Sequence, residues 1–196
     1  MSYLEEYADL IERREVIAGY WIKREIRNLI EDLEDPRWIY DTTEAEKRIR
    51  FEEALCLRSK APYYMKPIAL MPWQKAFWEA LYSFKDIETG RRRFTEGLLK
   101  VSRKNGKSTM LAADGTFDLF LGEGGEDLCC ASNDDRQARL IWREIAGMRD
   151  RLDPKRTITK PTLTELTNRR KNITVFRLSS KTQNKDGYNI SKAFLD

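Results

Sequence analysis

Apolar residues at helical spacing dominate the first third of the chain. Over residues 3–33 apolar side chains recur every three or four positions and charged side chains occupy the opposite side. This pattern predicts an amphipathic helix that ends before Asp35-Pro36. A second helix is predicted over 42–58, with Thr42 or Thr43 as its N-cap.

After Pro72 short apolar runs alternate with helical segments. Helices are predicted over 73–84, 107–121 and 134–152, the last capped by Asn133 or Asp134. Strands are predicted over 97–101, 127–131, 162–166, 172–178 and 193–195. Such alternation is typical of an α/β domain with a mostly parallel sheet flanked by helices. We therefore predict an N-terminal helical extension over 1–60 and an α/β domain over 61–196.

The most informative segment is 101–109, Val-Ser-Arg-Lys-Asn-Gly-Lys-Ser-Thr, which joins a predicted strand to a predicted helix. This is the layout of a phosphate-binding loop, in which a strand is followed by a tight polar loop, Gly-Lys-Ser and a helix. In such a loop the backbone N–H groups and the helix N-terminus hold anionic oxygens. Lys107 would reach the β- and γ-phosphates, and the Ser108 hydroxyl would bind Mg²⁺. Val101 stands where the full pattern G-x-x-x-x-G-K-[ST] has its first glycine.

The alternative interpretation of this segment is a solvated surface turn. A surface turn has to explain why Arg103, Lys104 and Lys107 gather around Gly106 between a strand and a helix. This clustering favours the phosphate-binding loop.

A phosphate-binding loop needs a carboxylate partner for Mg²⁺, usually an Asp at the end of an apolar strand. Ala193-Phe194-Leu195-Asp196 supplies one. Gln74, at the head of a predicted helix, has a side-chain amide that suits the edge of adenine. The alternative interpretation is an exposed Gln at the start of a helix beside a core Trp73, and this alternative is favoured when Gln74 is considered alone.

Composition excludes several classes of chemistry. The chain has no histidine, which removes His-based nucleophilic catalysis, His general bases and His-ligated zinc. Its three cysteines form no disulfide or metal pattern and are expected to pack as small apolar groups. There is no long apolar run and no signal-peptide pattern, so we expect neither a membrane protein nor a secreted one.

The net charge of +4, from 36 basic and 32 acidic side chains, indicates local rather than global attraction to nucleic acid. The two basic clusters are Arg91-Arg92-Arg93 and Arg169-Arg170-Lys171. Each suits contact with DNA phosphates, although a charged run is more often a solvated face.

Taken together, these motifs resemble the N-terminal ATPase half of the large terminase subunit, the genome-packaging motor of tailed bacteriophages. The segments that carry the resemblance are Val16-Ile17-Ala18-Gly19, the run from Lys23 to Leu33, Pro72-Trp73-Gln74, Arg92-Arg93-Phe94, Ser102 to Ser108, Ala131 to Arg139, Asp186-Gly187-Tyr188-Asn189 and Asp196. They span nearly the whole chain in the order typical of the family. Terminases commonly have an arginine inside a deviant loop, which accounts for the missing first glycine.

The resemblance implies roles for particular residues. The nucleotide would be held by Arg103, Lys104, Asn105, Gly106, Lys107, Ser108 and Thr109 of the loop and by Gln74 as the adenine-sensing residue. Arg103 would sense the γ-phosphate or stabilise its charge, and Asp196 would be the acid of the Mg²⁺ site. The family often supplies an arginine finger in trans, for which Arg136, Arg139 and Arg143 are open alternatives.

The implied function is ATP hydrolysis that drives double-stranded DNA into a procapsid. The implied cofactors are ATP and Mg²⁺, and the implied partners are duplex DNA, the small terminase subunit, the portal protein and further copies of the chain in a ring. The implied location is the host cytoplasm. Two alternatives stay open: another P-loop ATPase, such as a helicase-like translocase, or a non-hydrolysing remnant that serves as a binding or assembly piece.

The sequence departs from the family pattern at its end. The family has a catalytic Glu directly after the position of Asp196, and a C-terminal nuclease half follows, whereas the sequence stops at Asp196. We therefore expect these residues to be an excerpt of a longer protein that binds nucleotide weakly and turns it over slowly or not at all.

Overall fold

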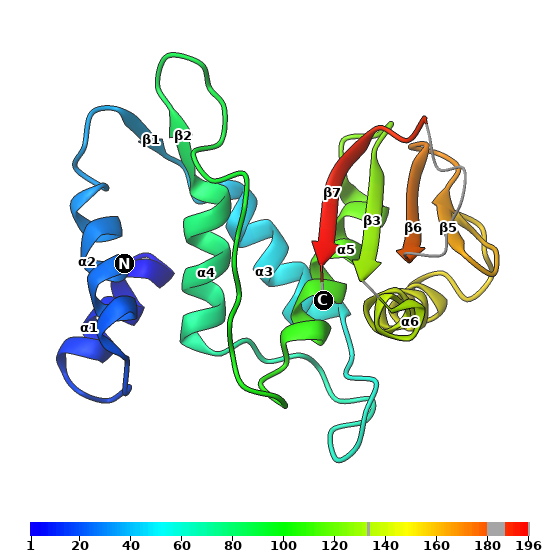
Figure 1. The fold of residues 1–196 in the computed structure, drawn as a ribbon, viewed down its shortest axis with the longest axis horizontal. Coiled ribbons are helices and arrows are strands. Elements are labelled where there is room, and N and C mark those ends of the chain that lie inside the picture. Colours follow the sequence, from blue (N-terminus) through cyan, green and yellow to red (C-terminus); the bar gives the residue numbers. More distant parts are fainter. Residues whose placement is uncertain (133, 180–186, 196) are drawn as a thin grey trace. The chain divides into compact units, whose positions relative to one another are not determined.

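The chain folds into two compact units (Figure 1). The computed structural model describes residues 1–132, 134–179 and 187–195. The first unit comprises Met1–Glu53 and Ala69–Leu99, and the second comprises Ala54–Ile68 and Lys100–Asp196.

The first unit is mainly helical. Its elements are α1 (Tyr3–Glu12), α2 (Tyr20–Glu31), β1 (Trp38–Tyr40), α3 (Thr43–Leu55), α4 (Pro72–Ser83) and β2 (Phe84–Asp86). The strands β1 and β2 pair antiparallel. Its core is a cluster in which Leu4 and Tyr7 of α1 pack with Leu29 of α2, Ala76 of α4 and Phe84.

The prediction of one helix over 3–33 is wrong, because α1 and α2 are separate helices. The chain leaves α1 after Arg13, and Arg14 has a left-handed φ of 60°. The N–H groups of Glu15 and Val16 then bond to the carbonyl oxygen of Leu10, which closes the end of the helix. The other helices predicted in this unit are confirmed with small shifts of their ends, as α3 and α4.

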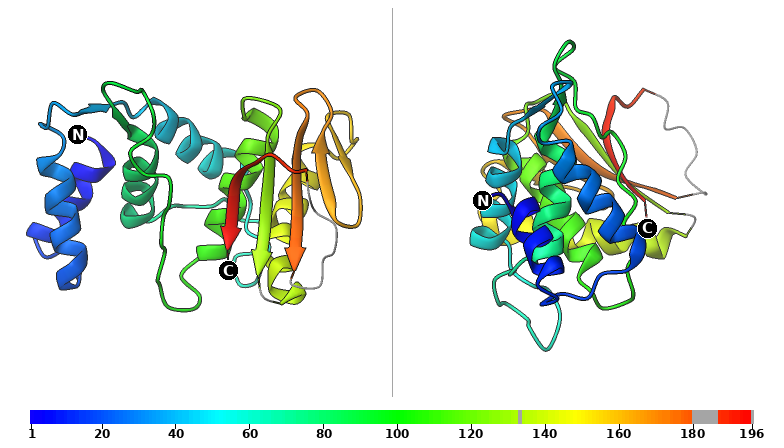
Figure 2. Two further views of the ribbon diagram at one scale, coloured as in Figure 1. Left: turned by 45° about the horizontal axis from the view of Figure 1, so that its top comes forward. Right: turned by 90° about the vertical axis from the view of Figure 1, so that its left-hand side faces the viewer.

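The second unit is an α/β layer. Its helices are α5 (Lys107–Leu121) and α6 (Asp135–Leu152), and its strands are β3 (Asp127–Ser132), β4 (Thr159–Pro161), β5 (Glu165–Asn168), β6 (Ile173–Ser179) and β7 (Ile190–Leu195). The sheet order is β4-β5-β6-β3-β7, with β6, β3 and β7 parallel and β4 and β5 antiparallel. Figure 2 shows the three parallel strands side by side. The predicted α/β class with a mostly parallel sheet flanked by helices is confirmed.

The strand predicted over 97–101 is absent from the described sheets. A strand needs a neighbour whose backbone groups complete its hydrogen bonds. Among the described strands, β7 lies at the edge of the sheet with β3 as its one neighbour. The apolar run therefore leads to α5 without a ladder of backbone hydrogen bonds. The predictions of α5, α6 and β3 are confirmed, and Asp134 caps α6 by accepting a hydrogen bond from the Arg136 N–H at 2.7 Å. Asn133 lies outside the described residues.

The turn from α6 to β4 is organised by one buried carboxylate. Asp153 is 3% exposed and accepts hydrogen bonds from the N–H groups of Thr157, Ile158 and Thr159 at 2.8–3.0 Å. The hydroxyl groups of Thr157 and Thr159 donate to it as well. Burial raises the pKa of Asp153, but these hydrogen bonds lower it more, so the pKa lies well below its ordinary value.

This arrangement predicts an acid-sensitive contribution to stability. The folded-state pKa of Asp153 lies below the unfolded value of about 3.9, so the contribution is present above that pH and is lost as the pH falls through the folded pKa. Asp153→Asn should lower the free energy of unfolding by about 1–3 kcal/mol at neutral pH. Urea unfolding at neutral pH and near pH 3 should show the difference from the parent shrinking in acid. The exposed Glu123→Gln is the control. An equal difference at both pH values contradicts this account.

Candidate functional site

The loop that precedes α5 is short, exposed and sharply turned. Residues 102–106 are all exposed, and Lys104 and Gly106 have left-handed φ values of 70° and 77°. The side-chain amide of Asn105 donates a hydrogen bond to the carbonyl oxygen of Ser102 at 3.1 Å, which closes the loop on itself. Glycine adopts this conformation without a steric penalty, so Gly106 lets the chain turn directly into the helix.

The N-terminal end of α5 directly follows the exposed loop. Gly106 is the N-cap, has no side chain to cap the helix, and accepts the first helical hydrogen bond from the Met110 N–H at 2.9 Å. The N–H groups of a first helical turn have no acceptor within the helix, and the helix dipole places partial positive charge there. Arg103 and Lys104 add two exposed cations beside it. This end of α5 is suited to an anion.

The first turn of α5 is tied to α6 by a buried carboxylate. Glu144 on α6 is 5% exposed, and its Oε2 accepts a hydrogen bond from the Thr109 hydroxyl at 2.9 Å. Its other oxygen, Oε1, forms an ion pair with Lys60 Nζ at 2.8 Å. One carboxylate thus fixes the start of α5 and the segment that carries Lys60.

A second ionic cluster ties β7 to the middle of α5. Lys192 Nζ lies 3.1 Å from Asp114 Oδ2 and also contacts Asp118, and both carboxylates are buried. At Gly115 an added Cβ would lie 3.0 Å from the ring of Phe194 and 2.9 Å from Ile145. The missing side chain lets α5 approach both β7 and α6 closely, which explains a glycine inside the helix.

The structure brings together the predicted loop residues from Arg103 to Thr109 at the start of α5. Gln74 lies in the first unit, where its Oε1 accepts a hydrogen bond from the Met71 N–H at 2.8 Å, and it is buried at the head of α4. Asp196 lies outside the described residues. The candidate finger residues Arg136, Arg139 and Arg143 all lie on α6.

Sequence reasoning missed the residues that support the loop: Lys60, Asp114, Asp118, Glu144 and Lys192. Each carries a charge that the sequence pattern assigns to a solvated face, and no motif marks them. The available signal for Asp114 and Asp118 was their spacing of one helical turn on a helix of otherwise largely apolar residues.

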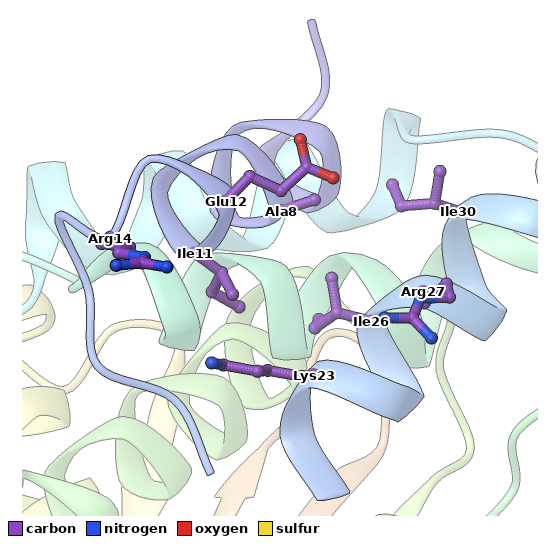
Figure 3. A pocket seen from close by; sticks show the side chains of 8 residues that line it. All are labelled: Ala8, Ile11, Glu12, Arg14, Lys23, Ile26, Arg27 and Ile30. Carbon is purple, nitrogen blue, oxygen red and sulfur yellow. The ribbon is translucent and has the colours of Figure 1, made fainter. Parts of the chain in front are cut away.

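A pocket of about 320 Å³ lies in the first unit and contains none of the predicted site residues (Figure 3). It lies between α1 and α2, and its lining consists of Ala8, Ile11, Glu12, Arg14, Lys23, Ile26, Arg27 and Ile30. Ile11, Ile26 and Ile30 also pack on the core of this unit. The pocket is therefore a groove along the junction of two packed helices.

Comparison with known proteins identifies the family. The family model described as terminase large subunit, ATPase domain, matches residues 72–196. The chain belongs to this family. Among solved structures, the large terminase of bacteriophage HK97 is similar, with 26% sequence identity and a TM-score of 0.64. That match covers 79% of this chain and 31% of the HK97 protein, so the chain spans about a third of the HK97 terminase. No curated protein matches the chain.

The described part of this terminase chain contains neither a membrane-spanning helix nor a cluster of metal-ligating side chains. None of its helices is long and apolar enough to cross a membrane. Within the same residues, no three acidic or cysteine side chains gather as metal ligands.

The cluster on β7 yields a prediction about how the site is supported. Lys192→Met removes the cation that faces two buried carboxylates and should lower the free energy of unfolding by about 2–4 kcal/mol. Lys192→Arg keeps the charge and is the matched control, with most of the stability retained. Urea unfolding measures both variants. Equal midpoints for Lys192→Met and the parent would show that the cluster is not a support.

Proposed function

We propose that the chain is the ATP-hydrolysing part of a phage motor that moves double-stranded DNA into a procapsid. The observation that carries the proposal is the exposed basic loop 102–106, which turns through Gly106 directly into the start of α5. Membership of the terminase ATPase-domain family favours ATP over other anions as the ligand of this loop. The chemistry is phosphoryl transfer to water, which depends on positioning and charge stabilisation rather than on covalent catalysis.

The loop would bind the triphosphate in the manner of a P-loop. Backbone N–H groups from Asn105 to Thr109 would surround the phosphate oxygens, and Lys107 would reach the β- and γ-phosphates. Lys107 is half-buried at the first position of α5, directly after the loop. Arg103 and Lys104 lie in the exposed loop, where Arg103 would contact the γ-phosphate and Lys104 would add positive charge.

The residues present fit a Mg²⁺ ion. Ser108 lies in the first turn of α5 and offers a hydroxyl oxygen, the kind of ligand that Mg²⁺ accepts beside phosphates and water. A phosphate-binding loop is usually completed by an Asp that follows an apolar strand, and Ala193-Phe194-Leu195 precedes Asp196 in the sequence. We therefore assign the second oxygen ligand to Asp196. When bound, the ion would neutralise charge on the β- and γ-phosphates.

The remaining assignments follow the family. Residues 61–196 would form the ATPase domain and residues 1–60 a helical extension, and Gln74 would contact adenine. A ring of copies would supply an arginine finger, and Arg136 and Arg143, both exposed on α6, are the more accessible of the three candidates. Duplex DNA, the small terminase subunit and the portal protein would be the partners. Host cytoplasm would be the location.

Isothermal titration calorimetry with Mg-ATP tests the site. Lys107→Ala should weaken binding by at least about tenfold, or ~1.4 kcal/mol, because it removes the cation closest to the terminal phosphates. Asp196→Ala should weaken Mg-ATP binding and leave binding of ATP without Mg²⁺ unchanged.

Lys160→Ala, an exposed lysine on β4, is the control for loss of one positive charge. Equal binding by Lys107→Ala and Lys160→Ala would exclude the loop as the nucleotide site.

A further inference from the structure

The segment between α3 and α4 forms a small hairpin in the second unit (Figure 1). Leu57 and Pro67 pair as an antiparallel bridge. The Arg58 N–H donates to the Lys66 carbonyl oxygen at 2.9 Å, and the Met65 N–H donates to the Arg58 carbonyl oxygen at 2.9 Å. At its base, the Arg151 guanidinium of α6 donates a hydrogen bond to the carbonyl oxygen of Leu57 at 3.1 Å. We name residues 57–67 the basic hairpin.

The basic hairpin presents cations and exposed aromatic rings without any carboxylate of its own. Its cations are Arg58, Lys60 and Lys66, and residues 54–68 contain no Asp or Glu. Tyr63 and Tyr64 are 51% and 62% exposed. The guanidinium of Arg58 lies 5.0 Å from the ring centre of Tyr63, and the Lys66 amine lies 5.8 Å from it, so one ring orders two cations.

We propose that the basic hairpin binds the phosphate backbone of duplex DNA. Arg58 and Lys66 would pair with phosphate oxygens, and the exposed Tyr64 hydroxyl would donate a further hydrogen bond. Such contacts carry no sequence information, which suits a protein that must engage every stretch of a genome. The inference rests on the proposed function for its choice of DNA, but the phosphate contacts that it names use no residue of the nucleotide loop.

The basic hairpin is also connected to the nucleotide loop. Lys60 of the hairpin pairs with Glu144, whose second oxygen accepts from Thr109 in the first turn of α5. Lys60 is 68% exposed, so a DNA phosphate can compete with Glu144 for its amine. When that happens, the buried Glu144 carboxylate is left without its cation, which is energetically unfavourable. The arrangement in which Glu144 accepts a hydrogen bond from Thr109 then becomes less stable. Lys60 and Glu144 are therefore positioning residues that couple DNA binding to nucleotide binding.

Fluorescence anisotropy with a labelled duplex of about 30 base pairs tests the DNA contact on the full chain without nucleotide. Arg58→Gln/Lys66→Gln should weaken binding about tenfold at low salt. The slope of log affinity against log salt should become shallower by about 2, since each phosphate contact contributes ~0.9. Thermal unfolding checks that the variant folds, and Lys66→Glu, at an exposed position, provides a second test by a single change.

Lys155→Gln/Lys160→Gln is the matched control, because it removes two exposed cations, one between α6 and β4 and one on β4, in the same unit. Its affinity and salt slope should match the parent. Equal losses in the two double variants would overturn the proposal in favour of general charge attraction. A single strand of equal length that competes better than the duplex would overturn the assignment to duplex DNA.

Calorimetry with and without the duplex tests the coupling. In the parent, DNA should change the Mg-ATP affinity several-fold, and Mg-ATP should change the DNA affinity by the same factor. Lys60→Gln and Glu144→Gln should bring this factor close to one, while Lys60→Arg should retain it. An unchanged factor in Lys60→Gln, or no coupling in the parent, would overturn the link. Failure of the parent to bind Mg-ATP would contradict the proposed function, whereas the anisotropy experiment still decides the DNA contact.

Discussion

The arrangement of the second unit depends on the contacts that hold α5 in place. The start of this helix must have a fixed position although the loop before it is exposed. The fixation comes from the buried side of the helix. Glu144 holds Thr109 in the first turn, and Lys192 joins the middle of α5 to β7 through two buried carboxylates. Gly115 lets the helix lie close to its neighbours. These contacts fix the helix from its buried side, while residues 102–106 of the loop are exposed.

Much of this unit could be predicted because its signals are local. Gly106 followed by Lys107 and Ser108 fixes where α5 begins, and the apolar run 127–131 is long enough to identify the central strand β3. The run 97–101 has a similar apolar character, yet no described strand pairs with it. Strand formation depends on a partner that the local pattern does not contain. For the same reason the three-residue strands β1, β2 and β4 gave no detectable signal.

The pattern also misjudged what becomes buried. Ile17 and Trp21 fit the helical period of residues 3–33, but they are 100% and 71% exposed, and the chain turns at Arg14 between two helices. The opposite error concerns charge. Glu144 and Asp114 look like solvated helix residues in the sequence and are 5% and 1% exposed in the fold. The periodicity of a sequence shows which residues share one side of a helix, but it does not show which other element packs against that side. The packing element determines whether a carboxylate is solvent-exposed or buried in an ion pair.

The central claim is that the nucleotide binds at the loop before α5, on a helix held by α6 and β7. Hydrogen–deuterium exchange of the full chain with and without Mg-ATP tests it most directly. The account predicts slower exchange of the amides from Arg103 to Met110, with weaker protection spreading to the neighbourhood of Glu144 and Lys60. Protection confined to the groove between α1 and α2, with the loop amides exchanging at their original rate, would contradict it.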